Sequence, residues 1–364
     1  MDGVPGLSPS SAPPLIPPER RVVFFLQGRD VPAARARGFA IARALAGAGV
    51  GSSLRAAVPS VYGDTRLPRP LRNWRPLFYP AALISRLTQL RDLRESDIVF
   101  FQRPMFEWPW IGLERWAARG RKSIFDFDDA IYLNRGGRAK LARLVGCVDR
   151  VIAGNRTLAE AAAAPEKTAV IPTAIDTVRF AGQATRSTVG PQVVVGWTGT
   201  AGNYPQLATA QRGIAAALRR TGARFLVICD KPPPALLSDL RPDYLPWVAT
   251  REVPDLTRID IGVMPLPDSP YARGKCAFKL LQYMAIGRPA VASPVGTNTE
   301  VITPGSDGFL ADSAEQWEEH LVRLIDDPEL RRRVGRAARL RVEADYSIAA
   351  LLPRYLALLA QLHG

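Results

Sequence analysis

Three positively charged side chains stand at the start of a predicted helix in the stretch YARGKCAFKLLQYMAIGRP, residues 271–289. They are Arg273, Lys275 and Lys279. The N-terminal end of a helix already carries partial positive charge and normally favours Asp or Glu. A continuous helix would place Lys275, Lys279 and Gln282 on one face. A solvated charged face is one explanation, but a site for an anionic ligand accounts better for cations that oppose the helix dipole.

A glycine-rich junction follows another predicted strand, in GWTGTAGNYPQL, residues 196–207. Here Gly199 and Thr200 would allow backbone N–H groups to approach and cradle a phosphate. The junction does not have the G-x-G-x-x-G pattern of dinucleotide-binding proteins, and a tight turn between strand and helix explains the same residues. Both interpretations stay open from spacing alone.

A third junction between a predicted strand and a helix is SPVGTNTEVI. Thr297 or Asn298 is expected to cap a helix whose first turn holds Glu300, and Glu300 serves either that cap or a ligand. Together, three loops at one edge of a sheet suit a nucleotide diphosphate better than any single loop does.

Acidic side chains end a strand in the first half of the chain, in FDFDDAIY. Strand alternation puts Asp126 and Asp128 on one face, with Asp129 next to them. Such carboxylates can accept hydrogen bonds from sugar hydroxyls, hold a cationic group or bind Mg²⁺. Capping of the following helix by Asp128 or Asp129 is the structural alternative.

Four arginines recur at every third residue in RLPRPLRNWRP: Arg66, Arg69, Arg72 and Arg75. Arginine beside an aromatic residue such as Trp74 suits an anionic membrane surface or a phosphorylated acceptor, and a solvated loop is the alternative. No nucleic-acid-binding module accompanies these residues, so nucleic acid is not an expected partner.

Alternation of short apolar runs and helical segments over the 364 residues predicts an α/β protein with two domains. The net charge is +14, and residues 1–185 hold 27 Lys and Arg against 16 Asp and Glu, so the first half attracts anions. Two histidines leave little for a histidine-based metal site, and three separated cysteines fit a reducing compartment. No apolar run is long enough to span a bilayer. The chain is divided into a proline-rich disordered tail without signal-peptide features, two doubly wound domains and a final helix: residues 1–20, 21–185, 186–345 and 346–364.

Several ordered blocks between residues 190 and 350, including LPWVATREVPDL and KLLQYMAIGRPAVASPVGTNTEVI, closely resemble the C-terminal half of family-4-type glycosyltransferases. SIFDFDDAIY, VIAGNRTLAE and VIPTAID resemble the N-terminal half of one branch of that family. The resemblance implies a GT-B fold, with two Rossmann-like domains that face a central cleft. It also implies a donor nucleotide sugar on the C-terminal domain, an acceptor on the N-terminal domain and a final helix that crosses back.

The same resemblance assigns roles to residues. Two glutamates of the family, eight residues apart, correspond here to Gly274 and Gln282, so the first carboxylate is missing, while Gln282 can still bond a ribose hydroxyl. Trp247 and Thr250 lie near where the family binds the base. Lys279, helped by Lys275 or Arg273, would hold the diphosphate. The full candidate donor site consists of Gly199, Thr200, Trp247, Thr250, Arg273, Gly274, Lys275, Gln282, Thr297, Asn298 and Glu300.

The predicted activity is transfer of a sugar from a nucleoside diphosphate sugar to an acceptor hydroxyl, with retention of configuration and without a metal or other cofactor. Lys279 would act on the leaving diphosphate, and Asp126, Asp128 and Asp129 would orient the acceptor. The acceptor would be a sugar, a lipid-linked molecule or a small molecule, in the synthesis of a cell-envelope polysaccharide, glycolipid or glycosylated natural product. We expect a cytoplasmic enzyme that can work at the inner face of an anionic membrane. A nucleotide-sugar epimerase and a catalytically silent sugar-nucleotide-binding partner are the alternatives.

Overall fold

The computed structural model describes residues 20–29, 31–58, 75–106, 108–181 and 192–362. The predicted N-terminal tail and most of the predicted linker therefore lie outside the described residues. The same holds for Arg66, Arg69, Arg72 and Trp74, and for the side chain of Arg75.

A first sheet of six parallel strands lies in the N-terminal half of the chain, in the order β2-β1-β3-β4-β5-β6. Its strands are apolar runs that are buried on both faces, as in RVVFFL and IVFFQ, with β2 as the exposed edge. Their bounds are β1 Arg21–Leu26, β2 Gly51–Ala56, β3 Ile98–Gln102, β4 Lys122–Phe127, β5 Arg150–Ala153 and β6 Thr168–Val170.

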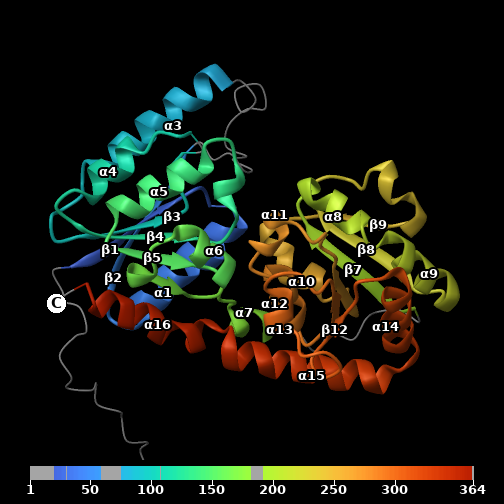
Figure 1. The fold of residues 1–364 in the computed structure, drawn as a ribbon. Helices are drawn as coiled ribbons and strands as arrows, with labels where there is room; N and C mark the ends of the chain where they lie inside the picture. The colour runs from blue at the N-terminus through green and yellow to red at the C-terminus, as the bar shows by residue number, and fades with distance from the viewer. Residues whose placement is uncertain (1–19, 30, 59–74, 107, 182–191, 363–364) are drawn as a thin grey trace, which may run out of the picture.

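A second sheet of six parallel strands lies in the C-terminal half, in the order β12-β11-β10-β7-β8-β9. Figure 1 shows the two sheets as separate layered domains, side by side, each with helices on both faces. The prediction of two doubly wound α/β domains is therefore confirmed. The strands are β7 Val194–Gly199, β8 Arg224–Cys229, β9 Asp243–Pro246, β10 Ile261–Met264, β11 Ala290–Ala292 and β12 Phe309–Leu310.

Helices fill the connections between the strands. A π-helix, η1 (Ala34–Phe39), continues directly into α1 (Ala40–Gly47) after β1. The other α-helices of the N-terminal half are α3 Arg75–Leu90, α4 Gly112–Ala118, α5 Gly137–Cys147, α6 Arg156–Ala162 and α7 Thr177–Ala181. Those that follow are α8 Tyr204–Ala208, α9 Gln211–Thr221, α10 Glu252–Leu256, α11 Pro270–Arg273, α12 Phe278–Ala285, α13 Asn298–Val301, α14 Ala314–Asp326, α15 Pro328–Asp345 and α16 Ile348–Ala360. Short 3-10 helices are η2 Ile131–Leu133, η3 Pro165–Lys167, η4 Ala201–Asn203, η5 Ala235–Leu240 and η6 Ala249–Arg251.

Strand alternation assigns each helix of the N-terminal domain to one face of the sheet. In β1, Val23 and Phe25 pack in the cluster that includes residues of α3, α4 and α5. Their neighbours Val22 and Phe24 pack in the opposite cluster, which includes α1 and α16. The domain thus has two apolar layers, one on each side of the strands.

The chain crosses between the domains twice, and the two crossings meet. Phe180 of α7 packs in the core of the C-terminal domain, whereas the sequence predicts a domain boundary at residue 185. The long helix α15 lies along the C-terminal domain, and α16 then continues to the N-terminal domain (Figure 1). Ile175 and Ser347 form an isolated parallel bridge, with Ile175 N donating to Tyr346 O and Ile348 N to Ile175 O.

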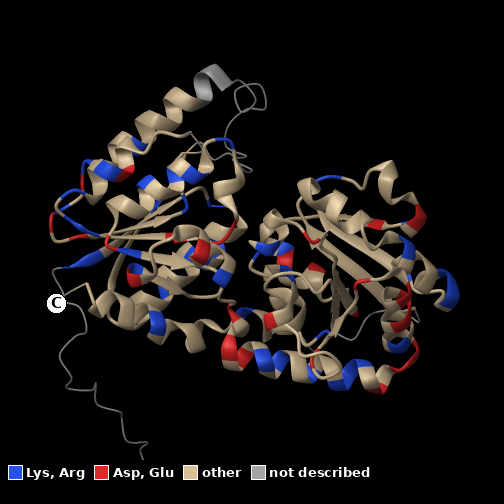
Figure 2. Cartoon of the chain, viewed as in Figure 1, with Lys and Arg blue, Asp and Glu red and all other residues tan. Residues whose placement is uncertain are grey.

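Charged residues are distributed unevenly over this framework. Figure 2 shows Lys and Arg along α15, where acidic residues are interspersed, and over the N-terminal domain. Several arginines of α15 pair with carboxylates three or four residues away on the same helix. Among the described residues, no helix combines the length and the apolar character that a membrane crossing requires.

Candidate active site

The end of β7 and the first turn of α12 are in direct contact. A Cβ atom at Gly199 would lie 2.5 Å from the Trp197 ring and 3.0 Å from Cε of Lys279. The Lys279 amine lies over the Trp197 ring, 5.6 Å from its centroid. The absence of a side chain at Gly199 therefore lets the strand end close against Lys279, and the structure brings together two residues that the sequence analysis singled out separately.

Lys279 carries an amine in an unfavourable place for a charge. Burial, together with the neighbouring Lys275, lowers the pKa of Lys279 to about 7. Within the part of the chain that the structure describes, Lys279 forms no ion pair and no hydrogen bond. It also lies in the first turn of α12, where the helix dipole adds positive potential. An anion at this point would be stabilised by both, and it would restore the charge of the amine.

The predicted continuous helix over this stretch is wrong. The chain forms α11 up to Arg273, then an irregular connection, and α12 begins at Phe278 after Ala277 with a positive φ of 51°. Lys275 lies in the connection, so it does not share a helix face with Lys279 and Gln282. The break is stabilised from the other domain, because Asn155 Nδ2 donates to the backbone oxygens of Arg273 and Lys275.

The other two cations of this stretch already have carboxylate partners. Arg273 pairs with Asp268 at 2.7 Å, and both side chains are more than half exposed. Lys275 lies 3.9 Å from Asp129 of the N-terminal domain and 4.4 Å from the ring centroid of Tyr271. Of the three, Lys279 is the one that faces the end of β7 without a counter-charge among the described residues.

The connection between α11 and α12 docks closely onto the N-terminal domain. A Cβ at Gly274 would lie 2.7 Å from Cβ of Ala130, and a Cβ at Gly154 would lie 2.4 Å from Sγ of Cys276. The Cys276 thiol also lies 3.4 Å from the backbone oxygen of Asp128. Position 274 therefore has no room for any side chain while the two domains are in this contact.

The acidic cluster at the end of β4 divides into one buried and two partly exposed carboxylates. Asp126 is fully buried and makes a two-pronged ion pair with Arg37 of η1, which is itself fully buried. Because this carboxylate does not reach the surface, direct contact of Asp126 with an acceptor, as expected from the sequence, does not occur in this arrangement. Arg37 also donates to Ile171 O, so the pair ties together η1 and the C-terminal ends of two strands.

Asp128 and Asp129 are arranged around Arg103, a residue with a positive φ of 62°. Asp128 accepts from Arg103 Nε at 2.6 Å, and Asp129 lies 3.7 Å from the same guanidinium. Burial disfavours the charge of Asp128, but Arg103 and Arg37 outweigh it and hold its pKa below the ordinary value. Asp129 accepts the backbone N–H of Ala130. These carboxylates hold cationic groups, one of the roles that the sequence left open.

Glu252 lies at the centre of a second link between the domains that the sequence analysis missed. Arg35 of η1 donates both terminal nitrogens to this carboxylate, at 2.6 and 3.3 Å, and Arg179 of α7 donates at 2.8 Å. Gln282 Nε2 donates to the same carboxylate at 3.2 Å. Glutamate in the first turn of a helix is common, so nothing in the sequence around Glu252 distinguishes it from an ordinary helix start.

The residues expected at the base lie next to this cluster. Trp247 is half-buried, and the Arg35 guanidinium lies 5.6 Å from its ring centroid. Thr250 is exposed in η6. Gln282 is buried, and its amide is bonded to Glu252.

The third junction differs from its prediction. Thr297 precedes α13 without a side-chain cap: its hydroxyl accepts from Asn155 Nδ2 at 3.1 Å. Asn298 Nδ2 donates to Ser293 O, and the Glu300 side chain is exposed. The predicted capping box is therefore wrong, because Thr297 bonds across the domain boundary instead of to its own helix. At the first junction, Thr200 is exposed and accepts from Asn203.

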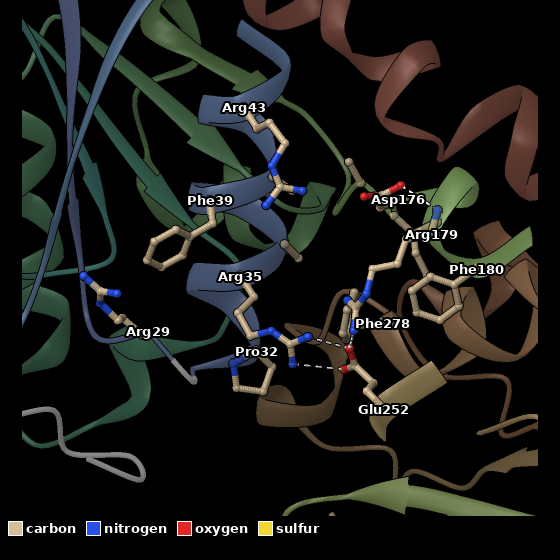
Figure 3. A pocket seen from close by; sticks show the side chains of 14 residues that line it. Arg29, Pro32, Arg35, Phe39, Arg43, Asp176, Arg179, Phe180, Glu252 and Phe278 are labelled. Atoms are coloured by element: carbon tan, nitrogen blue, oxygen red, sulfur yellow. Dashed lines mark hydrogen bonds and ion pairs between the residues drawn. The ribbon is translucent and has the colours of Figure 1, made fainter. Parts of the chain in front are cut away.

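A crevice of 420 Å³ opens between the two domains beside Glu252. Figure 3 shows Arg35 and Arg43 extending from η1 and α1 on one side, and Arg179 from α7 on the other. Its walls include aromatic residues of both domains. The lining residues are Arg29, Pro32, Arg35, Ala36, Phe39, Ala40, Arg43, Ala174, Ile175, Asp176, Arg179, Phe180, Glu252 and Phe278.

Two parallel six-stranded sheets with a site between them define the GT-B fold of glycosyltransferases. Residues 192–327, most of the C-terminal domain, match the family described as Glycosyl transferases group 1. The match and the fold together support a glycosyltransferase. No protein of curated function matches the chain by sequence.

Three solved structures are similar to nearly the whole chain. Alr3699/HepE from Anabaena in complex with UDP has a TM-score of 0.65 and 14% identity, over 94% of this chain and 100% of its own. A glycosyltransferase from Rickettsia africae has a TM-score of 0.67 and 13% identity, over 95% and 99%. A sucrose-phosphate synthase from Thermosynechococcus elongatus has a TM-score of 0.66 and 15% identity, over 94% and 99%. Likeness at such low identity establishes the fold.

Proposed function

We propose that this protein transfers a sugar from a nucleoside diphosphate sugar to an acceptor hydroxyl, with retention of configuration. One observation carries the proposal: the amine of Lys279, which has no ion-pair partner among the described residues, lies at the first turn of α12, against the glycine that ends β7. Anabaena Alr3699/HepE, which has the same fold, binds UDP and UDP-glucose. A diphosphate is the dianionic group that the Lys279 amine and the first turn of α12 would bind.

The reaction places a growing negative charge on the diphosphate as the glycosidic bond breaks. Lys279 and the backbone N–H groups of the Gly199–Thr200 loop and of α12 would stabilise that charge, and the proposal needs no metal ion for this step. No side chain stands out as a nucleophile. The acceptor hydroxyl therefore attacks from the side that the diphosphate leaves, and a diphosphate oxygen takes its proton.

The acceptor is assigned to the N-terminal domain, beside Asp128 and Asp129. Asp128 is bonded to Arg103, and Asp129 lies close to Lys275 and Tyr271 of the C-terminal domain. Carboxylates held in this way keep acceptor lone pairs for sugar hydroxyls. Asp126 is assigned a positioning role through Arg37.

The acceptor class that we propose includes lipid-linked molecules. The protein would bind them at the inner face of an anionic membrane. α3 lies at the outer end of the N-terminal domain (Figure 1), where Ile84 and Leu87 are 61% and 45% exposed. The helix has no acidic residue in RPLFYPAALISRLTQL. An apolar helix face on a basic domain suits adsorption to anionic lipid. Such an enzyme would act in the cytoplasm, in the synthesis of envelope polysaccharide, glycolipid or glycosylated natural products.

The decisive test incubates the purified protein with a panel of nucleotide sugars, with and without acceptor extracts, and measures release of nucleoside diphosphate. Release that depends on the extract is the expected result. Release without any acceptor would instead indicate a nucleotide-sugar epimerase or hydrolase. The Lys279→Ala variant in the same assay tests the assignment of the diphosphate site.

A catalytically silent nucleotide-sugar-binding partner is a second candidate, and Gly274 favours it. At the position where the resemblance expects a carboxylate, the Cβ of any side chain would meet Ala130 at 2.7 Å. A chain that keeps its domains closed in this way can bind a ligand and still lack a group needed for turnover. Tight binding of a nucleotide sugar without release from any donor would identify this second function.

A further inference from the structure

The crevice beside Glu252 carries more positive than negative charge. Four arginines line it, at positions 29, 35, 43 and 179, against the two carboxylates of Asp176 and Glu252. Glu252 is shared between Arg35 and Arg179 and also accepts from Gln282. One carboxylate therefore compensates the charge of two guanidinium groups. Each guanidinium has five N–H donors, so it can also donate hydrogen bonds to a further oxyanion.

Arg43 is an exposed arginine that lines the crevice. It extends from α1 and lines the same crevice as Arg35 and Arg179 (Figure 3). It forms no ion pair or hydrogen bond with any residue that the structure describes, whereas Arg35, Arg37 and Arg179 all do. Three guanidinium groups from three separate elements thus surround one cavity.

The walls of the crevice strengthen this arrangement. Phe39, Phe180 and Phe278 are among the lining residues and come from both domains. Apolar walls lower the local dielectric constant, which strengthens an interaction between a guanidinium and an oxyanion. They also offer a surface for the apolar or ring-shaped part of a ligand whose anionic group lies between the arginines.

The crevice and the Lys279 site lie on different sides of α12. Phe278 lines the crevice, whereas the next residue, Lys279, contacts Gly199 and Trp197. Gln282, one turn after Phe278, points to Glu252. An anion in the crevice is therefore not the same group as an anion at Lys279.

From these observations we infer that the crevice is a second oxyanion site, which binds a phosphate or carboxylate group between Arg35, Arg43 and Arg179. If the chain is the transferase proposed above, on which this part rests, the ligand of this site is an anionic group of the acceptor, and the reacting hydroxyl of the same acceptor lies beside Asp128 and Asp129. The donor nucleotide is the other source of a phosphate, and the experiment separates the two.

The test is isothermal titration with inorganic phosphate at constant ionic strength, in a Lys279→Gln background that removes the first anion site. We expect saturable binding in this background. Adding Arg43→Gln should weaken it about tenfold or more, because a charge-assisted hydrogen bond is lost. Arg43→Lys keeps the charge but loses the planar guanidinium that can donate two parallel hydrogen bonds. It should give an intermediate affinity for phosphate. Arg212 is an exposed residue of α9 and does not line the crevice, so Arg212→Gln makes the same charge change elsewhere and should have no effect.

A titration with UDP shows whether the donor nucleotide or the acceptor supplies the anionic group that binds in the crevice. Arg43→Gln in the otherwise unchanged chain should leave UDP affinity as it was, whereas Lys279→Gln should weaken it. Phosphate binding that is unaffected by Arg43→Gln would overturn the inference, as would an equal loss of phosphate and UDP binding. Neither titration depends on turnover, so the crevice can be confirmed even if no nucleotide sugar is consumed.

Discussion

Arg35 of the N-terminal domain and Glu252 of the C-terminal domain form an ion pair across the cleft, with 2.6 Å between Nη2 and Oε2. Because Arg179 also pairs with Glu252, removing the carboxylate leaves two neighbouring guanidinium groups without it. We expect Glu252→Gln to lower the stability of the protein by about 1–3 kcal/mol, measured as a lower midpoint of thermal unfolding. Asp243→Asn is the matched control, because it removes an exposed ion pair with Arg224 that contributes at most about 1 kcal/mol. Equal effects of the two substitutions would contradict a special role for Glu252.

The low pKa of Lys279 predicts a specific pH dependence of nucleotide binding. The amine is charged below its pKa of about 7 and neutral above it. A bound diphosphate favours the charged form and raises this pKa, so proton uptake accompanies binding above pH 7. The dissociation constant for UDP should be constant below pH 7 and rise about tenfold per pH unit above it, up to the pKa of the complex. Calorimetry between pH 6 and 9 measures this, and Lys279→Arg should remove the dependence. A dissociation constant for UDP that does not change with pH in the wild-type chain would contradict the assignment of Lys279 to the diphosphate.

Loss of the Lys279 amine should affect turnover far more than folding. Lys279→Ala should lower donor turnover by about 10²–10³, the range found when one group that stabilises developing charge is removed. The melting temperature should stay the same or rise, because a half-buried amine that has no ion-pair partner among the described residues costs stability. Unchanged release of nucleoside diphosphate would show that the diphosphate lies elsewhere.

Asp126 provides a test of a positioning role against a purely structural one. Asp126→Asn leaves the fully buried Arg37 without its counter-charge and should cost about 3–5 kcal/mol. The double variant Arg37→Met with Asp126→Leu replaces the pair by apolar groups and should recover most of that loss. If the recovered protein also regains full kcat and KM, Asp126 has no role beyond stability; a lasting rise in KM for the acceptor alone would indicate positioning.

Gly274 should control how closely the domains approach. Gly274→Glu restores the carboxylate that the resemblance expects, but its Cβ would meet Ala130 at 2.7 Å. We expect the contact between the α11–α12 connection and the N-terminal domain to open, with a larger radius of gyration in solution scattering. Gly146→Glu adds the same side chain at a position with no atom within 4 Å of its Cβ and should leave the radius unchanged. An unchanged radius in Gly274→Glu would show that the interface adjusts locally.

The fold was predictable from the sequence because its signals are local. Runs such as RVVFFL and RFLVIC predict buried parallel strands, and both form strands that are largely buried. Lys279 and Gly199 could also be singled out locally, as a cation at a helix start and a glycine at a strand end.

The predictions that were wrong, and the residue that was missed, depend on contacts between residues far apart in the sequence. The helix before Phe278 is broken by Asn155, 118 residues upstream of Arg273. The Thr297 hydroxyl accepts a hydrogen bond from the same asparagine instead of capping α13. Glu252 becomes notable only because Arg35 and Arg179 converge on it from two other elements. Periodicity and spacing along one chain carry no information about these long-range contacts.

The position of α16 has a consequence for the order in which the protein is made. Leu351, Tyr355 and Leu358 are part of the apolar layer that covers β1, so the first strand of the chain is completed by one of its last helices. During synthesis the ribosome must add all of the C-terminal domain before this layer can close, which takes roughly 10–35 s at 5–20 residues per second. Throughout that interval Val22 and Phe24 lack part of their cover. The nascent N-terminal domain is thus a natural client for chaperones, and a chain that ends before residue 348 would leave β1 without this part of its cover.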